Sequence, residues 1–491
     1  MIKNANMKLS EIFGSIYSVI SLKTLILISL YFAIAFPAFI LPIKFGAGAG
    51  ISIGLTCISS LLLYFLFFKF KSFFNSIKNL IGFTATKILS LFFCLNFLLI
   101  IIHTILGHND VAKPLMSFTY RLLTVVIPMF FGFYIVKYFK IKNMIKIHYF
   151  ILYLIMIFGL FEFIIFFFNI DILQTFYHFI NNLRMVLDGK ITRAYYGIFP
   201  RIQTGFDEPA YFAFFLNVHI PLIYNLSFSK YKIFKNKFLN LFIKKSFPFM
   251  LWFIILGIQS PIHIIIAGTI TLLYIISKLS TKKRIYYISG LTTFGFVTIY
   301  LLKTIDMSRT FLGRIQHFIN MFNFNNLTCL IYADESLGTR LISYINAFYV
   351  FLSHPFIGCG TGNFLRAITL QSLKSPVPYT AEYARRMAKP GYVPTNVNIL
   401  YVLLAELGFI ATLVYYAFFI SLIITINKKL KYASGLFKDF IQGFYFMLII
   451  YIFLTSYESL ISYFWIEWGI LLGILYLHDK QKGFIIENIN S

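Results

Sequence analysis

Acidic side chains and cysteines are scarce in this sequence. It has 17 aspartates and glutamates against 43 lysines and arginines, and only four cysteines among 491 residues. Charged residues make up 12% of the chain, hydrophobic residues make up 59%, and the mean hydropathy is +0.80. Soluble domains contain about 25% charged residues, so this composition excludes an ordinary soluble fold. The four cysteines are too few for a disulfide framework.

Several motifs that define other classes of protein are also missing. The sequence has no P-loop, no HExxH, no CxxC and no cluster of histidines. ATP-driven work and a thiolate metal site are therefore not indicated, and we expect no metal and no cofactor. The net charge of +26 does not indicate a nucleic-acid partner, because the basic residues are scattered between hydrophobic segments and form no soluble basic face.

Apolar segments recur along almost the whole chain. A helix needs about 20 mostly apolar residues to cross the hydrocarbon core, and the segments predict one all-α integral membrane domain over residues 1–491 with about twelve transmembrane helices. We place them near residues 24–43, 49–68, 84–106, 119–137, 148–169, 210–228, 247–259, 261–277, 285–302, 397–426, 441–457 and 460–477.

Lysine-rich connections alternate with poorly basic ones and set the predicted orientation. Because basic loops stay in the cytoplasm, both termini are expected there. Two long loops, residues 170–209 and 303–396, then lie outside the cytoplasm. These loops have enough irregular polar chain to build a site.

Arginine is distributed differently from lysine. Of the eleven arginines, only Arg284 falls on the cytoplasmic side of this topology. A genome rich in A and T would account for the many lysines, and ion pairs within loops would account for some external arginines. The guanidinium group matches phosphate oxygens two at a time, so we favour an external site for a phosphate or another anion.

Three segments carry the candidate residues. In "RIQTGFDEPAYFAFFL", Arg201 precedes two adjacent carboxylates, Asp207 and Glu208, and Pro209 then opens a helix. A helix cap explains one of the carboxylates. The pair together with the arginine also forms a plausible acid/base and anion constellation.

The second segment is "GTRLISYINAFYVFLSHPFIGCGTGNF", which begins at Gly338. Apolar residues at helical spacing predict a helix along the membrane interface near residues 340–353, ending at His354. Three glycines at alternate positions, Gly358, Gly360 and Gly362, then allow close approach of the backbone. No strand precedes them, which disfavours a nucleotide-binding loop.

The third segment, "PTNVNILYVLLAELGFIATLVYYAFFI", has Asn398 at the start of a helix and Glu406 about two turns inside it. An ionisable residue within a span indicates function by default. A structural ion pair with a loop arginine explains Glu406 equally well. Four further intramembrane residues are interpreted as packing or helix-to-helix hydrogen bonds, namely Glu162, His219, His263 and Glu467.

In their order, these three segments resemble the O-antigen polymerase (Wzy-type) and O-antigen ligase superfamily over residues 190–425. The resemblance implies a metal-independent membrane glycosyltransferase with a GT-C-like bundle. In ligases a His-Asn pair precedes the glutamate that matches Glu406, and counting back places that pair at Val397 and Asn398. The histidine is missing here, which favours a polymerase over a ligase.

The resemblance further implies a bacterial inner-membrane enzyme that joins repeat units carried on undecaprenyl pyrophosphate, with membrane lipid and a chain-length regulator as partners. Fixed cations would stabilise the departing pyrophosphate. We expect Arg201 and Arg340 to supply them, followed by Arg193, Arg314 and Arg366. Glu208, then Asp207, is expected to act as the base. Glu406 is expected to position a loop or an arginine, and His354 and Asn398 are further candidates.

Three alternatives remain open from the sequence. They are a ligase that transfers finished polymer to a lipid-A core, a flippase or other transporter, and a structural scaffold of an export complex. A transporter is disfavoured because the informative charges gather in two long outer loops rather than deep in the bundle.

Overall fold

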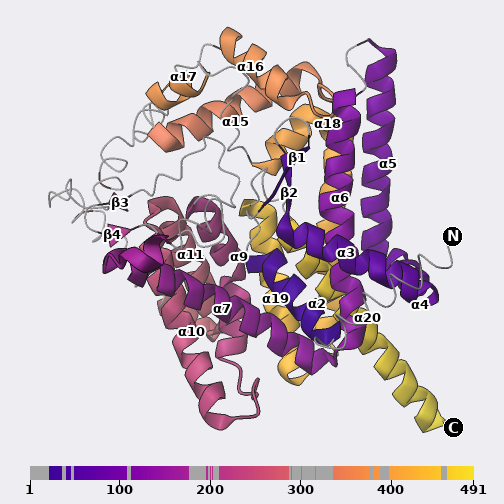
Figure 1. Cartoon of the computed structure of the whole chain (residues 1–491), viewed down its shortest axis with the longest axis vertical. Coiled ribbons are helices and arrows are strands. Elements are labelled where there is room, and N and C mark those ends of the chain that lie inside the picture. Colours follow the sequence, from indigo (N-terminus) through magenta and orange to yellow (C-terminus); the bar gives the residue numbers. More distant parts are fainter. Residues whose placement is uncertain are drawn as a thin grey trace.

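The computed structural model describes residues 22–35, 40–45, 49–107, 112–175, 195–196, 199–200, 202, 209–286, 289, 300, 316, 335–375, 380–387, 398–454 and 462–490. These residues are almost entirely helical (Figure 1). Six described helices, or seven if one bent pair counts as a single span, are long and apolar enough to cross a membrane. The predicted all-α membrane class is confirmed, and the total of about twelve spans stays a prediction.

The helices are α2 (Leu22–Ala35), α3 (Ile53–Phe68), α4 (Phe70–Ile81), α5 (Thr84–Ile105), α6 (Ala112–Ile135), α7 (Ile141–Phe167), α9 (Pro209–Ser227), α10 (Lys237–Ile258), α11 (Pro261–Lys278), α15 (Glu335–Ser353), α16 (Phe364–Lys374), α17 (Ala381–Met387), α18 (Ile399–Leu430), α19 (Gly435–Leu454) and α20 (Ser462–Asn490). A 3₁₀ turn, η1 (Val136–Tyr138), follows α6. Two short antiparallel hairpins pair β1 (Ile40–Phe45) with β2 (Ala49–Ser52) and β3 (Tyr195–Tyr196) with β4 (Phe199–Pro200).

The first two predicted spans differ from the structure. The helix expected over residues 24–43 ends at Ala35, and strand β1 begins at Ile40. Pro42 lies within that strand and has no N–H for a helical hydrogen bond, which disfavours a regular helix through to residue 43. The next predicted span, 49–68, begins only at Ile53, and α3 then meets α4 at a bend of 116°.

Helix α10 begins well before the predicted residue 247. The side chain of Asn236 accepts a hydrogen bond from the backbone N–H of Leu239, a helix cap that the lysines around it concealed in the sequence. The predicted turn before α11 is present: Gln259 adopts φ 55°, and Pro261 is the first residue of α11.

Helices α6 and α20 pack with their backbones in contact. A Cβ added at Gly132 of α6 would lie 2.1 Å from the carbonyl oxygen of Ile466, and one added at Gly469 of α20 would lie 2.0 Å from that of Met129. Without a hydrophobic drive between helices in lipid, small residues that let backbones approach are a main source of association. These two glycines therefore set the crossing at the centre of the bundle.

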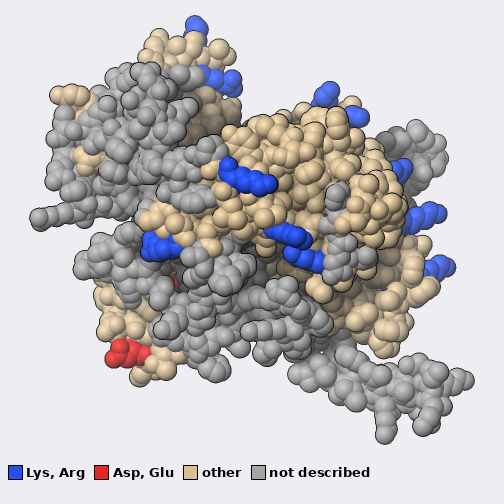
Figure 2. Space-filling view, turned by 90° about the horizontal axis from the view of Figure 1, so that it is seen from above, with Lys and Arg blue, Asp and Glu red and all other residues tan. Residues whose placement is uncertain are grey.

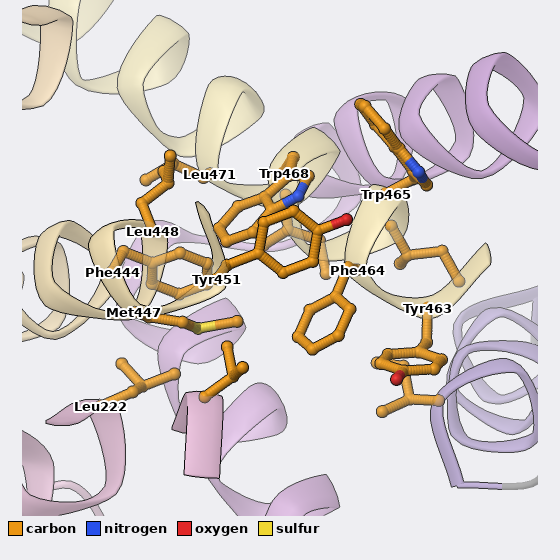
Figure 3. Packing of buried hydrophobic residues seen from close by; sticks show 14 of the residues in the cluster. Leu222, Phe444, Met447, Leu448, Tyr451, Tyr463, Phe464, Trp465, Trp468 and Leu471 are labelled. Atoms are coloured by element: carbon orange, nitrogen blue, oxygen red, sulfur yellow. The ribbon is translucent and has the colours of Figure 1, made fainter. Parts of the chain in front are cut away.

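Aromatic side chains fill the interior beside this crossing. Tyr451 of α19 lies between Phe464 and Trp468 of α20, with ring centroids 4.7 and 5.4 Å away (Figure 3). Across from them, Leu222 of α9 packs where Gly443 of α19 leaves room for its Cα. The core thus joins α9, α19 and α20 into one rigid unit.

Three helices form a cap at one end of the molecule. Figure 1 shows α15, α16 and α17 gathered above the start of α18 and far from α10. All three belong to the part of the chain predicted as the second external loop, residues 303–396. The view from above shows lysine and arginine side chains over the described surface, and few acidic ones (Figure 2).

Candidate functional site

Glu406 lies in α18, the helix that contacts both the cap helix α15 and the bundle helix α5. Its side chain is 2% exposed and forms a buried ion pair with Arg121 of α6, through Oε2 and Nη2. Its other oxygen, Oε1, accepts a hydrogen bond of 2.9 Å from the backbone N–H of Gly362. Both carboxylate oxygens are therefore engaged, one by a cation and one by a loop.

Helix α18 is broken next to Glu406. Gly408 has φ 74° and ψ −176°, which no residue with a side chain adopts readily. The break frees backbone groups that a membrane helix would normally pair internally, and each must find a partner where water is excluded. The carbonyl oxygen of Ala405 accepts from the N–H of Cys359 at 2.8 Å, and that of Glu406 accepts from Gly360 at 3.0 Å.

Residues 354–363, here called the glycine loop, supply the backbone donors to these two carbonyl oxygens. Gly358, Gly360 and Gly362 all have positive φ. A Cβ at Gly358 would lie 2.3 Å from the carbonyl carbon of Glu406, and one at Gly408 would lie 2.3 Å from the carbonyl oxygen of Phe356. The absence of side chains at these glycines thus lets the backbone of the glycine loop pack directly against the backbone of α18.

Helix α5 holds the other side of the glycine loop. Thr361 donates a hydrogen bond of 2.6 Å to Oδ1 of Asn96, and Nε2 of His103 donates to the carbonyl oxygen of Ile357 at 3.1 Å. Burial raises the pKa of the Cys359 thiol, and the nearby Glu406 carboxylate raises it further. Cys359 therefore stays a thiol and is a poor nucleophile.

The cap has its own polar core. Asn346 of α15 donates hydrogen bonds to Ser372 of α16 and Tyr383 of α17, and these two hydroxyls lie 2.6 Å apart. On another face of α15, Tyr344 stacks on Tyr401 of α18 with ring centroids 5.2 Å apart. The cap helices are therefore fixed to one another and to the bundle.

Arg340 lies on this anchored helix, near its N-terminal end. It is half-buried, and its Nε atom has no hydrogen-bond partner among the described residues. Arg366 of α16 and His354 are exposed. The backbone of His354 closes α15, because its N–H bonds to Phe351 and its carbonyl accepts from Gly358.

Asn398 is the N-cap of α18. Its Oδ1 accepts from the N–H of Leu400 at 2.9 Å, and its Nδ2 donates to the carbonyl oxygen of Phe453. The other five predicted site residues lie outside the described residues: Arg193, Arg201, Asp207, Glu208 and Arg314.

Two residues were missed by sequence reasoning. Arg121 falls on the external side of the predicted topology, but it is not among the residues predicted to pair with Glu406. The available signal is its place inside the predicted span 119–137, because an arginine within a span requires a buried carboxylate as its partner. His148 was not singled out, yet it lies beside His219 and Glu467. His219 and Glu467 form the helix-to-helix hydrogen bond that their type suggested, at 2.8 Å. No protein-family model matches the sequence, and no curated protein matches it either.

Proposed function

We propose that this membrane protein is a metal-independent glycosyltransferase that polymerises lipid-linked oligosaccharide repeat units on the external face of a bacterial inner membrane. The proposal rests on the resemblance of its three segments to the Wzy-type polymerases. Within the structure, the observation that carries it is the placement of Arg340. Its guanidinium is half-buried, its Nε has no partner among the described residues, and its helix is anchored to the bundle, which are properties that suit a preorganised anion site.

Chemistry at an anomeric carbon explains why preorganised cations matter. When the bond to undecaprenyl pyrophosphate breaks, negative charge grows on the leaving oxygen. A fixed guanidinium stabilises that charge without having to reorganise at the moment of reaction. The attacking sugar hydroxyl loses its proton to a base, for which Glu208, the residue before Pro209 in the sequence, is our candidate.

The ion pair between Arg121 and Glu406 helps to hold the cap, which carries Arg340, in place. It connects α6 and α18 to Gly362, and the glycine loop connects directly to both α15 and α16. Glu406 has its two oxygens engaged, so we assign it to positioning the cap rather than to proton transfer. Binding of the substrate on a cap held this firmly would cost little ordering entropy.

The test is the length of surface polysaccharide made by a deletion strain that carries the gene on a plasmid. For a polymerase, deletion leaves single repeat units on the lipopolysaccharide, and the wild-type gene restores the ladder. Arg340→Ala should lower the polymerisation rate about 10²-fold, and Glu208→Gln should lower it by about 10² to 10⁴. Arg340→Lys should recover little, because lysine lacks the bidentate fork.

Lys374→Ala is the matched control, since Lys374 is an exposed cation on the neighbouring helix of the cap. It should leave the ladder unchanged at equal membrane expression. A bare core after gene deletion would point to a ligase and sink the proposal. Full-length chains from Glu208→Gln would remove that residue as the base, and unchanged chains from Arg340→Ala would remove the anion site.

A further inference from the structure

Three ionisable side chains meet in the interior of the bundle, away from the glycine loop and the cap. They are His148 of α7, His219 of α9 and Glu467 of α20, and none of them has any exposed surface. One potential metal-binding atom from each lies within 4.8 Å of the other two. Their helices are distant in sequence, so the cluster exists only in the folded chain.

The hydrogen bonds of His219 define where its lone pair points. Its Nδ1 lies 2.6 Å from the carbonyl oxygen of Phe215. A carbonyl oxygen can only accept, so Nδ1 carries the proton, and a neutral ring then has its lone pair on Nε2. That atom lies 2.8 Å from Oε1 of Glu467, which is itself an acceptor. At this distance the two atoms either share a proton, which makes the hydrogen bond described above, or contact a common metal cation.

A single proton does not satisfy the whole cluster. Nε2 of His148 lies 3.8 Å from the same Oε1. Neither ring nitrogen of His148 has a hydrogen-bond partner among the described residues, and neither does Oε2 of Glu467. Leaving buried polar atoms without hydrogen-bond partners is unfavourable, because they lose their contacts with water and gain none in return. A divalent cation would engage all three side chains at once.

We propose that His148, His219 and Glu467 bind a divalent transition-metal ion, with Zn²⁺ the best match, that joins α7, α9 and α20. Zn²⁺ binds imidazole nitrogen and carboxylate oxygen at about 2.0–2.2 Å, which places tetrahedral ligands roughly 3.3 Å from one another. The distances of 2.8 and 3.8 Å fall on either side of that value. Small side-chain rotations are enough to admit the ion.

The surroundings suit such a site. The bond from Nδ1 of His219 to a backbone carbonyl is the usual outer contact that orients a metal-binding imidazole. The rings of Phe464 and Phe444 pack on His219 and His148, which keeps water away. Three side-chain ligands leave a fourth position, and hydroxide there would neutralise the complex. Metal binding here is independent of the proposed glycosyl transfer.

The metal content of the full-length chain tests this site. The protein is purified in detergent through a Strep-type tag, without a metal-affinity column, incubated with Zn²⁺, and freed of excess ion. Elemental analysis should find about one zinc per chain, as expected for three ligands at one ion. His148→Ala, His219→Ala and Glu467→Gln should each reduce it to background. His263→Ala changes another histidine of the apolar helices, outside the cluster, and should keep the metal.

A second measurement uses only the wild-type protein, so it does not depend on whether the variants fold. Wild-type protein loaded with Co²⁺ instead of Zn²⁺ should show the intense visible absorption of tetrahedral cobalt, and a competing excess of Zn²⁺ should abolish it. A wild-type chain that stays monodisperse yet binds neither ion would overturn the proposal and leave a shared proton as the occupant. Equal zinc in wild type and all three cluster variants would also overturn it.

Discussion

The ion pair between Arg121 and Glu406 is costly to form and costly to break. Transferring either charge from water into a low-dielectric interior carries a penalty of several kcal/mol that only close pairing and further hydrogen bonds offset. Here the carboxylate has both, because Gly362 donates to its second oxygen. The pair therefore links α6, α18 and the glycine loop at this point.

Arg121→Met should strongly destabilise the protein. It leaves the Glu406 carboxylate buried without its counter-ion, and loss of one partner of a buried pair costs about 3–5 kcal/mol. The double variant Arg121→Met/Glu406→Met should recover much of that loss, since it buries no charge. Thermal unfolding in detergent measures both, with Arg366→Met as the exposed control. Equal unfolding temperatures for wild type and Arg121→Met would contradict a stabilising pair.

At the scale of elements, the glycine loop and the broken helix α18 form one joint. Gly408 interrupts the helix, and the loop supplies backbone donors to the carbonyls that the interruption frees. The sequence placed both halves of this joint within candidate segments but gave no indication that they touch. Glycines at alternate positions are compatible with many kinds of contact. That they pack against the break in α18 follows only from the tertiary structure.

Gly358→Ala should disrupt this joint. A positive φ costs a residue with a Cβ about 1–3 kcal/mol, and the added carbon would overlap the backbone of Glu406. The expected result is a lower unfolding temperature and loss of activity in the polysaccharide assay. Gly268→Ala in α11 is the control, because a Cβ there meets nothing within 4 Å. That change should leave the protein as stable or slightly more so. Tolerance of alanine at Gly358 would show that the loop does not dock as described.

At the scale of the whole molecule, the bundle separates a cap from a basic opposite side. The cap helices α15 to α17 lie far from the connection between α9 and α10 (Figure 1). That connection contains the exposed Lys230. The distribution of lysines predicts that it faces the cytoplasm and that the cap faces outward.

Cysteine labelling checks this orientation. In a chain whose four native cysteines are replaced, His354→Cys and Lys230→Cys each place a thiol at an exposed position. A maleimide that cannot cross the membrane should label the first in sealed right-side-out vesicles, and the second only after the vesicles are opened. The reverse pattern would invert the topology and place the cap on the side where lipid-linked repeat units are built.

Composition and local pattern were enough to determine the all-α membrane class of this protein and the positions of several of its described helices. Apolar length is a property of consecutive residues, and it predicted α5, α9 and α11 to within one residue of their observed bounds. It was less accurate where a local signal competed with hydropathy. The apolar segment that contains Pro42 forms strand β1 rather than a helix, and the Asn236 cap begins α10 among lysines.

The tertiary structure alone decided which charges pair. The sequence offered Glu406 a choice of external arginines, and the fold selected Arg121. Helix α18 packs beside α5, which also contacts α6, and the Arg121 guanidinium of α6 reaches Glu406 near the break in α18. The fold also brings His148, His219 and Glu467 together from three helices. Hydrophobic periodicity specifies which face of a helix is buried. It does not specify which buried polar groups meet, since that depends on the depth and rotation at which separate helices pack.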